Sequence, residues 1–183
     1  MSIASQRAAD AAELFAERSP ETTRTRTITW QDPVPTAAAG GRMSGMEYVS
    51  AIRAGELPPP PIGVVMNYAI AEVEEGRTVF EGEPGEEHYN PIGVVHGGYA
   101  STILDSALGS AVHTTLPAGV GYTSQTLEVK YLRPITRDTG VVRCEARVLH
   151  RGRKTATAEA RLTAASSGKL LASGTSTCLI FGE

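Results

Sequence analysis

Two glycines follow a histidine at His96-Gly97-Gly98, where a segment with helical spacing begins. The first N–H groups of a helix have no partner within the helix, and the helix dipole adds partial positive charge there. Because glycine leaves these groups open, the helix end can hold an anion, or the oxyanion that forms when a carbonyl carbon is attacked. The alternative is a tight turn that needs glycine for a positive φ.

A carboxylate, Asp105, lies in the middle of the same predicted helix and shares a face with Gly98, Ser101 and Gly109. These small residues predict that another element packs closely against that face. A buried carboxylate must be paired, hydrogen-bonded or used in chemistry, because removing its charge from water is costly. A solvent-exposed polar face, or a structural hydrogen bond to a strand, is the alternative.

The spacing between these groups indicates an oligomer. Gly97 and Asp105 are separated by ~12 Å along the axis of one helix, so both cannot reach the same carbon atom. If they cooperate, they come from two copies of the chain. Two such helices that lie antiparallel across a two-fold axis bring Asp105 of each copy near Gly97 of the other, so the motif predicts a homodimer with two shared sites.

Two polar residues precede the glycines. Asn90 is followed by Pro91 and lies in a predicted loop, where its side-chain NH₂ can donate a second hydrogen bond to an oxyanion. His96 can orient a carbonyl group or hold the loop through a hydrogen bond. A lone loop histidine or asparagine more often has a structural role.

The remaining pattern predicts an α+β domain in which an antiparallel sheet wraps around one long central helix, residues 97–114. Ser44 with Glu47 predicts a capped helix that ends at Gly55. Residues 4–18 predict a short amphipathic helix, and 19–41 an extended, turn-rich stretch. The predicted units are an N-terminal extension, 1–43, and a domain, 44–183. The predicted strands are 62–73, 77–83, 123–133, 139–150, 154–165 and 169–181.

Composition excludes several classes of protein. The 17 Lys and Arg against 20 Asp and Glu give a net charge of −3, which disfavours nucleic-acid binding. No apolar run is long enough for a membrane span, and the first residues lack a secretory signal, so we expect a cytoplasmic protein. Cys144 and Cys178 are expected to be reduced thiols rather than a disulfide. The four histidines have no metal-ligand spacing, and neither a metal nor another cofactor is expected.

The Asn90-Pro-Ile-Gly-Val-Val-His96-Gly97-Gly98 segment, with Asp105 nine residues after the histidine, resembles the PaaI-like acyl-CoA thioesterases of the hotdog superfamily. Similarity extends over about residues 44–181 and includes the segments 104–109 and 131–134. The resemblance implies hydrolysis of an acyl-CoA substrate, by a homodimer or a dimer of dimers.

The resemblance also implies roles for residues. The Gly97 N–H and the Asn90 side chain polarise the thioester carbonyl, and His96 supports them. Asp105 of the partner subunit acts as general base or as nucleophile, and the sequence leaves both open. Related enzymes place Ser or Thr on the next strand, and counting favours Ser124 over Thr123. Gly98 contributes to substrate binding, and candidates for the CoA phosphates are Arg133, Arg151, Arg153 and Lys154.

Two other functions compete with hydrolysis. A hydratase of the same fold needs a catalytic histidine in a different motif. A non-catalytic acyl-CoA-binding module has no need of a carboxylate at the carbonyl group, so Asp105 argues against it. The acyl group stays open, and Tyr48, Met66, Tyr68, Tyr89 and Tyr99 are candidates to line its channel.

Overall fold

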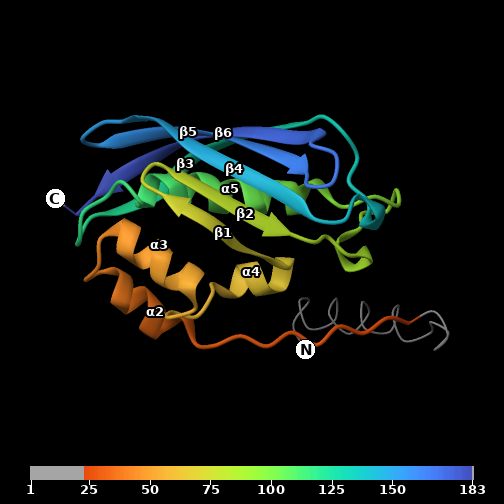
Figure 1. Cartoon of the computed structure of the whole chain (residues 1–183), viewed down its shortest axis with the longest axis horizontal. Coiled ribbons are helices and arrows are strands. Elements are labelled where there is room, and N and C mark those ends of the chain that lie inside the picture. Colours follow the sequence, from red (N-terminus) through yellow and green to blue (C-terminus); the bar gives the residue numbers. More distant parts are fainter. Residues whose placement is uncertain (1–22, 183) are drawn as a thin grey trace, which may run out of the picture.

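The computed structural model describes residues 23–182 and has the predicted hotdog architecture: an antiparallel six-stranded sheet curves around one long helix (Figure 1). The strand order is β1-β2-β4-β5-β6-β3, so β1 and β3 form the edges. The strands are β1 Tyr68–Glu74, β2 Arg77–Gly82, β3 Gly121–Tyr131, β4 Val142–Arg151, β5 Thr155–Ala164 and β6 Leu170–Phe181. Residues 4–18, predicted to be helical, lie outside the described part.

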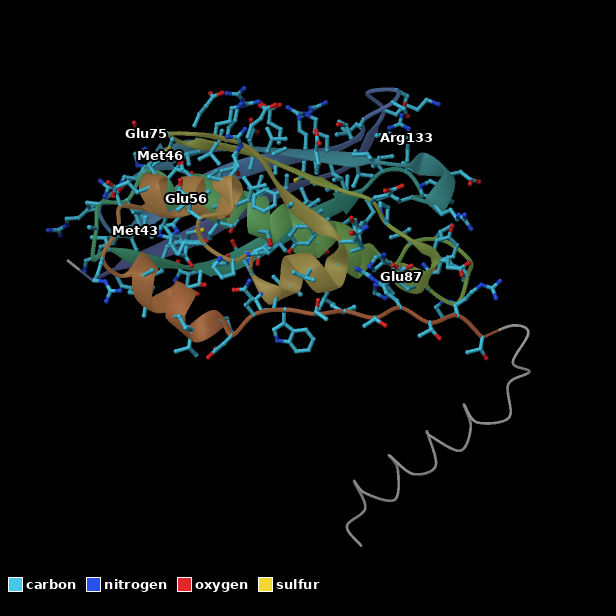
Figure 2. All side chains as sticks on the ribbon, turned by 60° about the horizontal axis from the view of Figure 1, so that its bottom comes forward. Met43, Met46, Glu56, Glu75, Glu87 and Arg133 are labelled. Carbon is cyan, nitrogen blue, oxygen red and sulfur yellow. The ribbon has the colours of Figure 1, made fainter. Side chains whose placement is uncertain are left out.

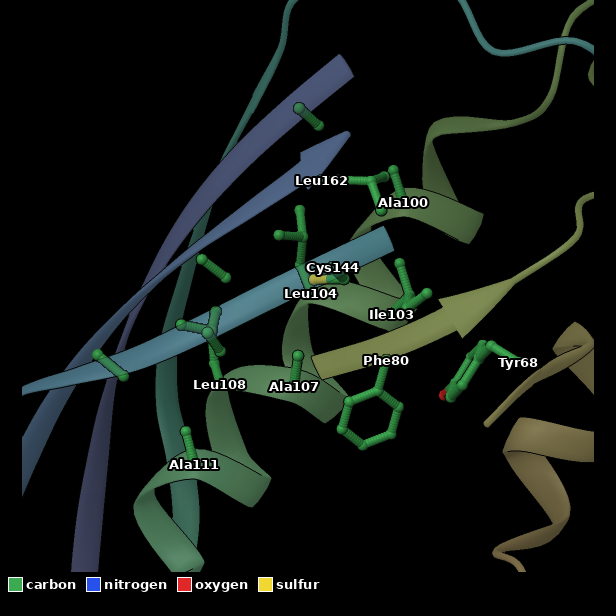
Figure 3. Packing of buried hydrophobic residues seen from close by; sticks show 14 of the residues in the cluster. Tyr68, Phe80, Ala100, Ile103, Leu104, Ala107, Leu108, Ala111, Cys144 and Leu162 are labelled. Atoms are coloured by element: carbon green, nitrogen blue, oxygen red, sulfur yellow. The ribbon is translucent and has the colours of Figure 1, made fainter. Parts of the chain in front are cut away.

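The central helix α5, Gly97–His113, provides the core. Its apolar face, which includes Ile103, Leu104 and Leu108, is fully buried against the concave side of the sheet. Figure 3 shows these side chains pointing toward β4 and its neighbours, where Cys144 and Leu162 meet them. The burial of the apolar face fixes the rotation of α5 and therefore the direction in which its polar face points.

The first predicted strand, residues 62–73, is wrong in its first half. Residues Pro61–Met66 form the short helix α4, and β1 begins only at Tyr68. Pro61 lies in the first turn of α4, where proline is well tolerated because that N–H has no helical partner. Asn67 ends α4 in a left-handed conformation, with φ of 55°. The Val-rich composition of this segment had favoured a strand.

The helix predicted after Ser44 is confirmed as α3, Gly45–Ala54. Ser44 accepts a hydrogen bond from the Glu47 N–H, the Glu47 carboxylate accepts one from the Ser44 N–H, and Gly55 ends the helix with φ of 77°. The start of α3 packs against the end of α5, because the Gly45 N–H donates to the carbonyl of Leu116. This contact positions α3 beside the C-terminal half of α5.

The N-terminal segment is not extended throughout, as the sequence had suggested, because Pro33–Gly40 forms the helix α2, with Asp32 as its cap. Before α2, Arg26 anchors the chain to the end of α4 and to the loop after β2. Its guanidinium donates to the carbonyls of Val64 and Val65 and to the carboxylate of Glu87. Glu87 lies close to the N-terminal segment in Figure 2.

Both cysteines are free and buried, Cys144 on β4 and Cys178 on β6. Burial raises the pKa of the Cys144 and Cys178 thiols, which disfavours the thiolate and makes neither a reactive nucleophile. Within residues 23–182, no helix has the length and apolar character that a membrane span needs.

The contact between α3 and α5 gives a test of the fold. A Cβ added at Gly45 would lie 1.7 Å from the carbonyl oxygen of His113, so α3 must move to accept it. We expect Gly45→Ala to lower the free energy of unfolding by about 1–3 kcal/mol, measured by urea denaturation. Gly41→Ala is the control, because its Cβ meets nothing closer than 3.7 Å. Equal stability of the two variants would contradict this packing.

Candidate active site

The N-terminus of α5 has one N–H group that is free for a ligand. His96 caps the helix, and its Nδ1 accepts a hydrogen bond of 2.8 Å from the Gly98 N–H. The Tyr99 N–H donates to the carbonyl of His96. The Gly97 N–H has no partner within residues 23–182, so it is the donor of the first turn that can bind an oxyanion.

The loop before α5 is held by hydrogen bonds to its own backbone. Asn90 Oδ1 accepts from the N–H groups of Ile92 and Val94, at 3.1 and 3.2 Å. The His96 N–H donates to the carbonyl of His88, which closes the loop against its own beginning. Because only the Asn90 oxygen is used, its NH₂ group stays available as a donor in the described structure.

Asp105 is half-buried and forms a hydrogen bond with the next strand. The hydroxyl of Ser124, on β3, donates to Asp105 Oδ1 at 2.9 Å. The structure therefore brings Ser124 to the carboxylate and turns the neighbouring Thr123 to the other face of β3. The register of β3 against β6 shifts directly after Ser124, at a bulge of the kind that often lies beside active sites. The second carboxylate oxygen has no partner in the described part.

Asp105 and Ser124 line a cavity of about 320 Å³ that lies beneath α3 and α4. Its walls come from α3, α4, β1, β2, β3 and the polar face of α5. Of the five residues proposed for the acyl channel, Tyr48 and Tyr68 line this cavity, whereas Met66, Tyr89 and Tyr99 do not. Tyr99 is only 1% exposed and packs in the core. Its hydroxyl is buried without a hydrogen-bond partner in the described structure.

Gly97 lines a different cavity, of about 430 Å³, together with His96, Tyr131 and Arg133. The ring of Tyr131 covers Gly97, and its hydroxyl forms a hydrogen bond of 2.6 Å with Ser101. Aromatic side chains of β3 therefore cover part of the small-residue face of α5 within the same chain. The two halves of the motif therefore open into separate cavities, as the helical spacing predicts.

The four candidate basic residues lie at opposite ends of the sheet. Arg133 follows β3, beside the start of β6, where its N–H donates to Leu171, and it is labelled in Figure 2. Arg151, Arg153 and Lys154 form the exposed turn between β4 and β5, beside the end of β6, because the Lys154 carbonyl accepts from Ile180. The distance along β6 between these ends is about 30 Å. Of these four residues, only Arg133 lines the same cavity as Gly97 within one chain.

Sequence reasoning missed Ser106, Ser110, His113 and Tyr122, which also line the cavity of Asp105. Residues 106, 110 and 113 of α5 come after Asp105 in the sequence and share one helix face, because they are spaced by four and then three positions. This polar stripe is visible in the sequence, next to the apolar one. Tyr122 packs over Gly109, whose absent side chain leaves room for the ring.

Comparisons with known proteins agree with this architecture. The model of the thioesterase superfamily matches residues 92–170. Human acyl-coenzyme A thioesterase 13 is 30% identical over 111 residues, which cover 61% of this chain and 78% of that protein.

Two solved structures are similar over most of their length. A phenylacetic acid degradation-related protein from Ralstonia eutropha is 30% identical with a TM-score of 0.66, over 72% of this chain and 98% of that one. A variant of the phenylacetic acid degradation protein PaaI from Thermus thermophilus is 26% identical with a TM-score of 0.59, over 66% and 98%. The family match over residues 92–170 covers the central helix α5 and the strands β3, β4 and β5. The chain therefore belongs to the thioesterase superfamily, with the hotdog fold.

Proposed function

We propose that this protein hydrolyses acyl-CoA thioesters to a carboxylic acid and CoA, in active sites shared between two subunits. The observation that carries the proposal is the arrangement along α5, where a free N–H at Gly97 and the Asp105–Ser124 pair face different cavities. An oxyanion donor and a carboxylate are the two groups that thioester hydrolysis needs. The names of the similar proteins support the choice of acyl-CoA.

The chemistry follows from these groups. The carbonyl oxygen of the thioester accepts hydrogen bonds from the Gly97 N–H and from the NH₂ group of Asn90, which stabilise its negative charge in the transition state. Asp105 of the partner subunit takes a proton from a water molecule, which attacks the carbonyl carbon. The hydroxyl of Ser124 orients the carboxylate and the water. Collapse of the intermediate expels the CoA thiolate, which is then protonated.

Asp105 can instead attack the carbonyl carbon directly and form an anhydride that water then hydrolyses. The hydrogen bond from Ser124 leaves one carboxylate oxygen without a partner in the described structure, so both routes fit. The non-catalytic alternative does not use the Asp105–Ser124 pair. A module that only binds acyl-CoA gains nothing from a negative charge beside the carbonyl oxygen.

The exposed edge of the sheet supports the dimer. Among residues 23–182, β3 pairs only with β6, and its other side offers unpaired backbone groups along eleven residues. Leu127, Tyr131 and Leu132 are exposed apolar side chains on or just beyond this edge. A second copy that pairs antiparallel along β3 covers this edge and brings the two α5 helices together.

This pairing also brings the candidate basic residues of the two subunits to the same end of the sheet. In an antiparallel pair, the turn at residues 151–154 of one subunit lies at the same end as Arg133 of the other. We propose that Arg133 binds the CoA phosphates from the Gly97 side, with Arg151, Arg153 or Lys154 contributed by the other subunit. The Gly98 N–H is not available as a donor, because it is hydrogen-bonded to His96. The proposed role of Gly98 is therefore to leave space for the substrate, since it has no side chain.

Removing the charge of Asp105 tests its role. Asp105→Asn keeps the shape of the side chain but cannot act as base or nucleophile, so we expect kcat for CoA release to fall about 10²–10⁴-fold. Release is followed by thiol titration with a panel of acyl-CoA esters. Asp138→Asn, at an exposed site in the loop after β3, is the matched control. An undiminished kcat in Asp105→Asn would contradict the proposed mechanism.

The Gly97 N–H can be removed with little change to the helix. Proline is compatible with the first helical position, and His96 has ψ of 138°, a value favoured before proline. We expect Gly97→Pro to lower kcat about 10²–10³-fold, as for the loss of one oxyanion donor. Gly97→Ala keeps the N–H and crowds the same Tyr131 ring. If both variants lose activity equally, the ring contact and not the N–H is responsible.

Mixed dimers test whether the site is shared. A dimer of one Asp105→Asn chain and one Gly97→Pro chain has one site with both groups intact. Random mixing at equal concentrations is therefore expected to restore about a quarter of the wild-type activity, since half of the dimers are mixed. No recovery, with mixed dimers confirmed by mass spectrometry, would place both groups in one subunit.

A further inference from the structure

Beyond Asp105, the cavity ends among polar side chains that surround His113. The Tyr48 ring, from α3, lies 5.5 Å from the His113 ring, and the Tyr122 ring, from β3, lies 5.3 Å from it on another side. Ser110 precedes His113 by about one turn of α5 and faces the same cavity. We call Tyr48, Ser110, His113 and Tyr122 the polar end of the cavity.

The polar end is unusual because its side chains lack hydrogen bonds. None of the four side chains has a hydrogen-bond partner among residues 23–182. Other polar side chains of α5 do: Thr102 donates to the Gly98 carbonyl, and Ser106 bonds to the hydroxyl of Tyr68 at 2.8 Å. Among the described residues, Tyr99 has the side-chain polar atom that is both fully buried and unpaired, so the polar atoms of these four side chains are open to the cavity, where a ligand with polar atoms can bond to them.

The side chains of the polar end are uncharged, which favours a neutral group of the ligand there. Burial lowers the pKa of His113, so its imidazole is uncharged at neutral pH and offers one donor and one acceptor. Burial also raises the pKa of Tyr48 and Tyr122, which keeps both hydroxyls protonated. One acidic side chain, Asp105, and one basic side chain, Arg53, also line the cavity, and Arg53 Nε donates to the Ala71 carbonyl. A hydroxyl group suits this end better than a carboxylate.

The position of the polar end sets the size of the acyl group. Asp105 and His113 are separated by ~12 Å along the axis of α5, so a thioester held at Asp105 needs a chain of medium length to reach His113. Between them, the walls are mainly apolar and include Ile52, Ile70 and Phe80. The cavity therefore offers a reactive end, an apolar middle and a polar, uncharged end.

On the basis of the proposed thioesterase activity, we propose that the preferred substrates are medium-length acyl-CoA esters with a hydroxyl group at the far end of the acyl chain. The hydroxyl bonds to His113, with Tyr48 and Ser110 as further partners. A site with hydrogen-bonding groups for a substrate hydroxyl discriminates against the analogue without it, because those groups then lack their partner.

Two esters that differ only in this group test the proposal. We expect kcat/KM for ω-hydroxyoctanoyl-CoA to exceed that for octanoyl-CoA about 3- to 10-fold, the effect of one hydrogen bond gained in exchange with water. Equal values, or a preference for octanoyl-CoA, would overturn the proposal. The ratio is measured on one preparation, so the fraction of folded enzyme cancels.

Variants at the polar end test whether its side chains cause the preference for the hydroxyl ester. Tyr48→Phe and Ser110→Ala each remove a single unpaired hydroxyl, and His113→Gln replaces the ring. We expect the ratio to fall toward one in the combined Tyr48→Phe, Ser110→Ala variant and in His113→Gln. Tyr89→Phe is the control, because its hydroxyl accepts from Arg137 N outside this cavity, and its ratio stays at the wild-type value. A ratio that survives all changes at the polar end would overturn the proposal.

A binding measurement separates this proposal from the proposed function. Thioether analogues of the two esters cannot be hydrolysed, and their affinities are measured by calorimetry with wild-type protein. If neither ester releases CoA, the proposed function is contradicted, whatever the affinities show. If both esters are hydrolysed but the two analogues bind equally and react equally, the thioesterase stands and the hydroxyl preference falls.

Discussion

The rise of an α-helix is the constraint on which the active site depends. A helix advances 1.5 Å per residue, and α5 is continuous from Gly97 to His113. Its first free N–H and its carboxylate are therefore held apart, in two cavities. No rearrangement of side chains within one chain brings them to one carbon atom. Dimerisation is thus part of the proposed chemistry, in which each α5 would contribute to two sites.

The same helix is rigid because it is the core of the domain. Its apolar face is sealed against the sheet, which leaves only a polar face for function. Along α5, the order of residues gives the order of the proposed tasks: the oxyanion donor at Gly97, the carboxylate at Asp105 and the polar end at His113. The cap from His96 and the bond from Ser124 fix the first two groups. Packing and chemistry share one helix but use opposite sides of it.

The sequence predicted the sheet and the central helix well, because strand alternation and helical spacing are local signals, whereas the place of Ser124 near Asp105 was implied by the family resemblance. It failed at residues 61–66, where Val-rich composition outweighed the proline that starts α4. It also failed to predict that Tyr122 lies against His113. Their contact joins β3 to the end of α5, and tertiary contacts of this kind leave no trace in local spacing. The separation of Arg133 from Arg151 likewise follows from strand topology, which turns a short distance in sequence into opposite ends of a sheet.

A crystal structure of the dimer tests the shared site most directly. The ligand is an uncleavable acyl-CoA ketone, in which a methylene group replaces the thioester sulfur. The account predicts that the ketone oxygen lies within hydrogen-bond distance of the Gly97 N–H of one subunit, while the carboxylate facing the carbonyl carbon is Asp105 of the other. A carbonyl group held by Gly97 with no Asp105 from a second chain beside it would contradict the account.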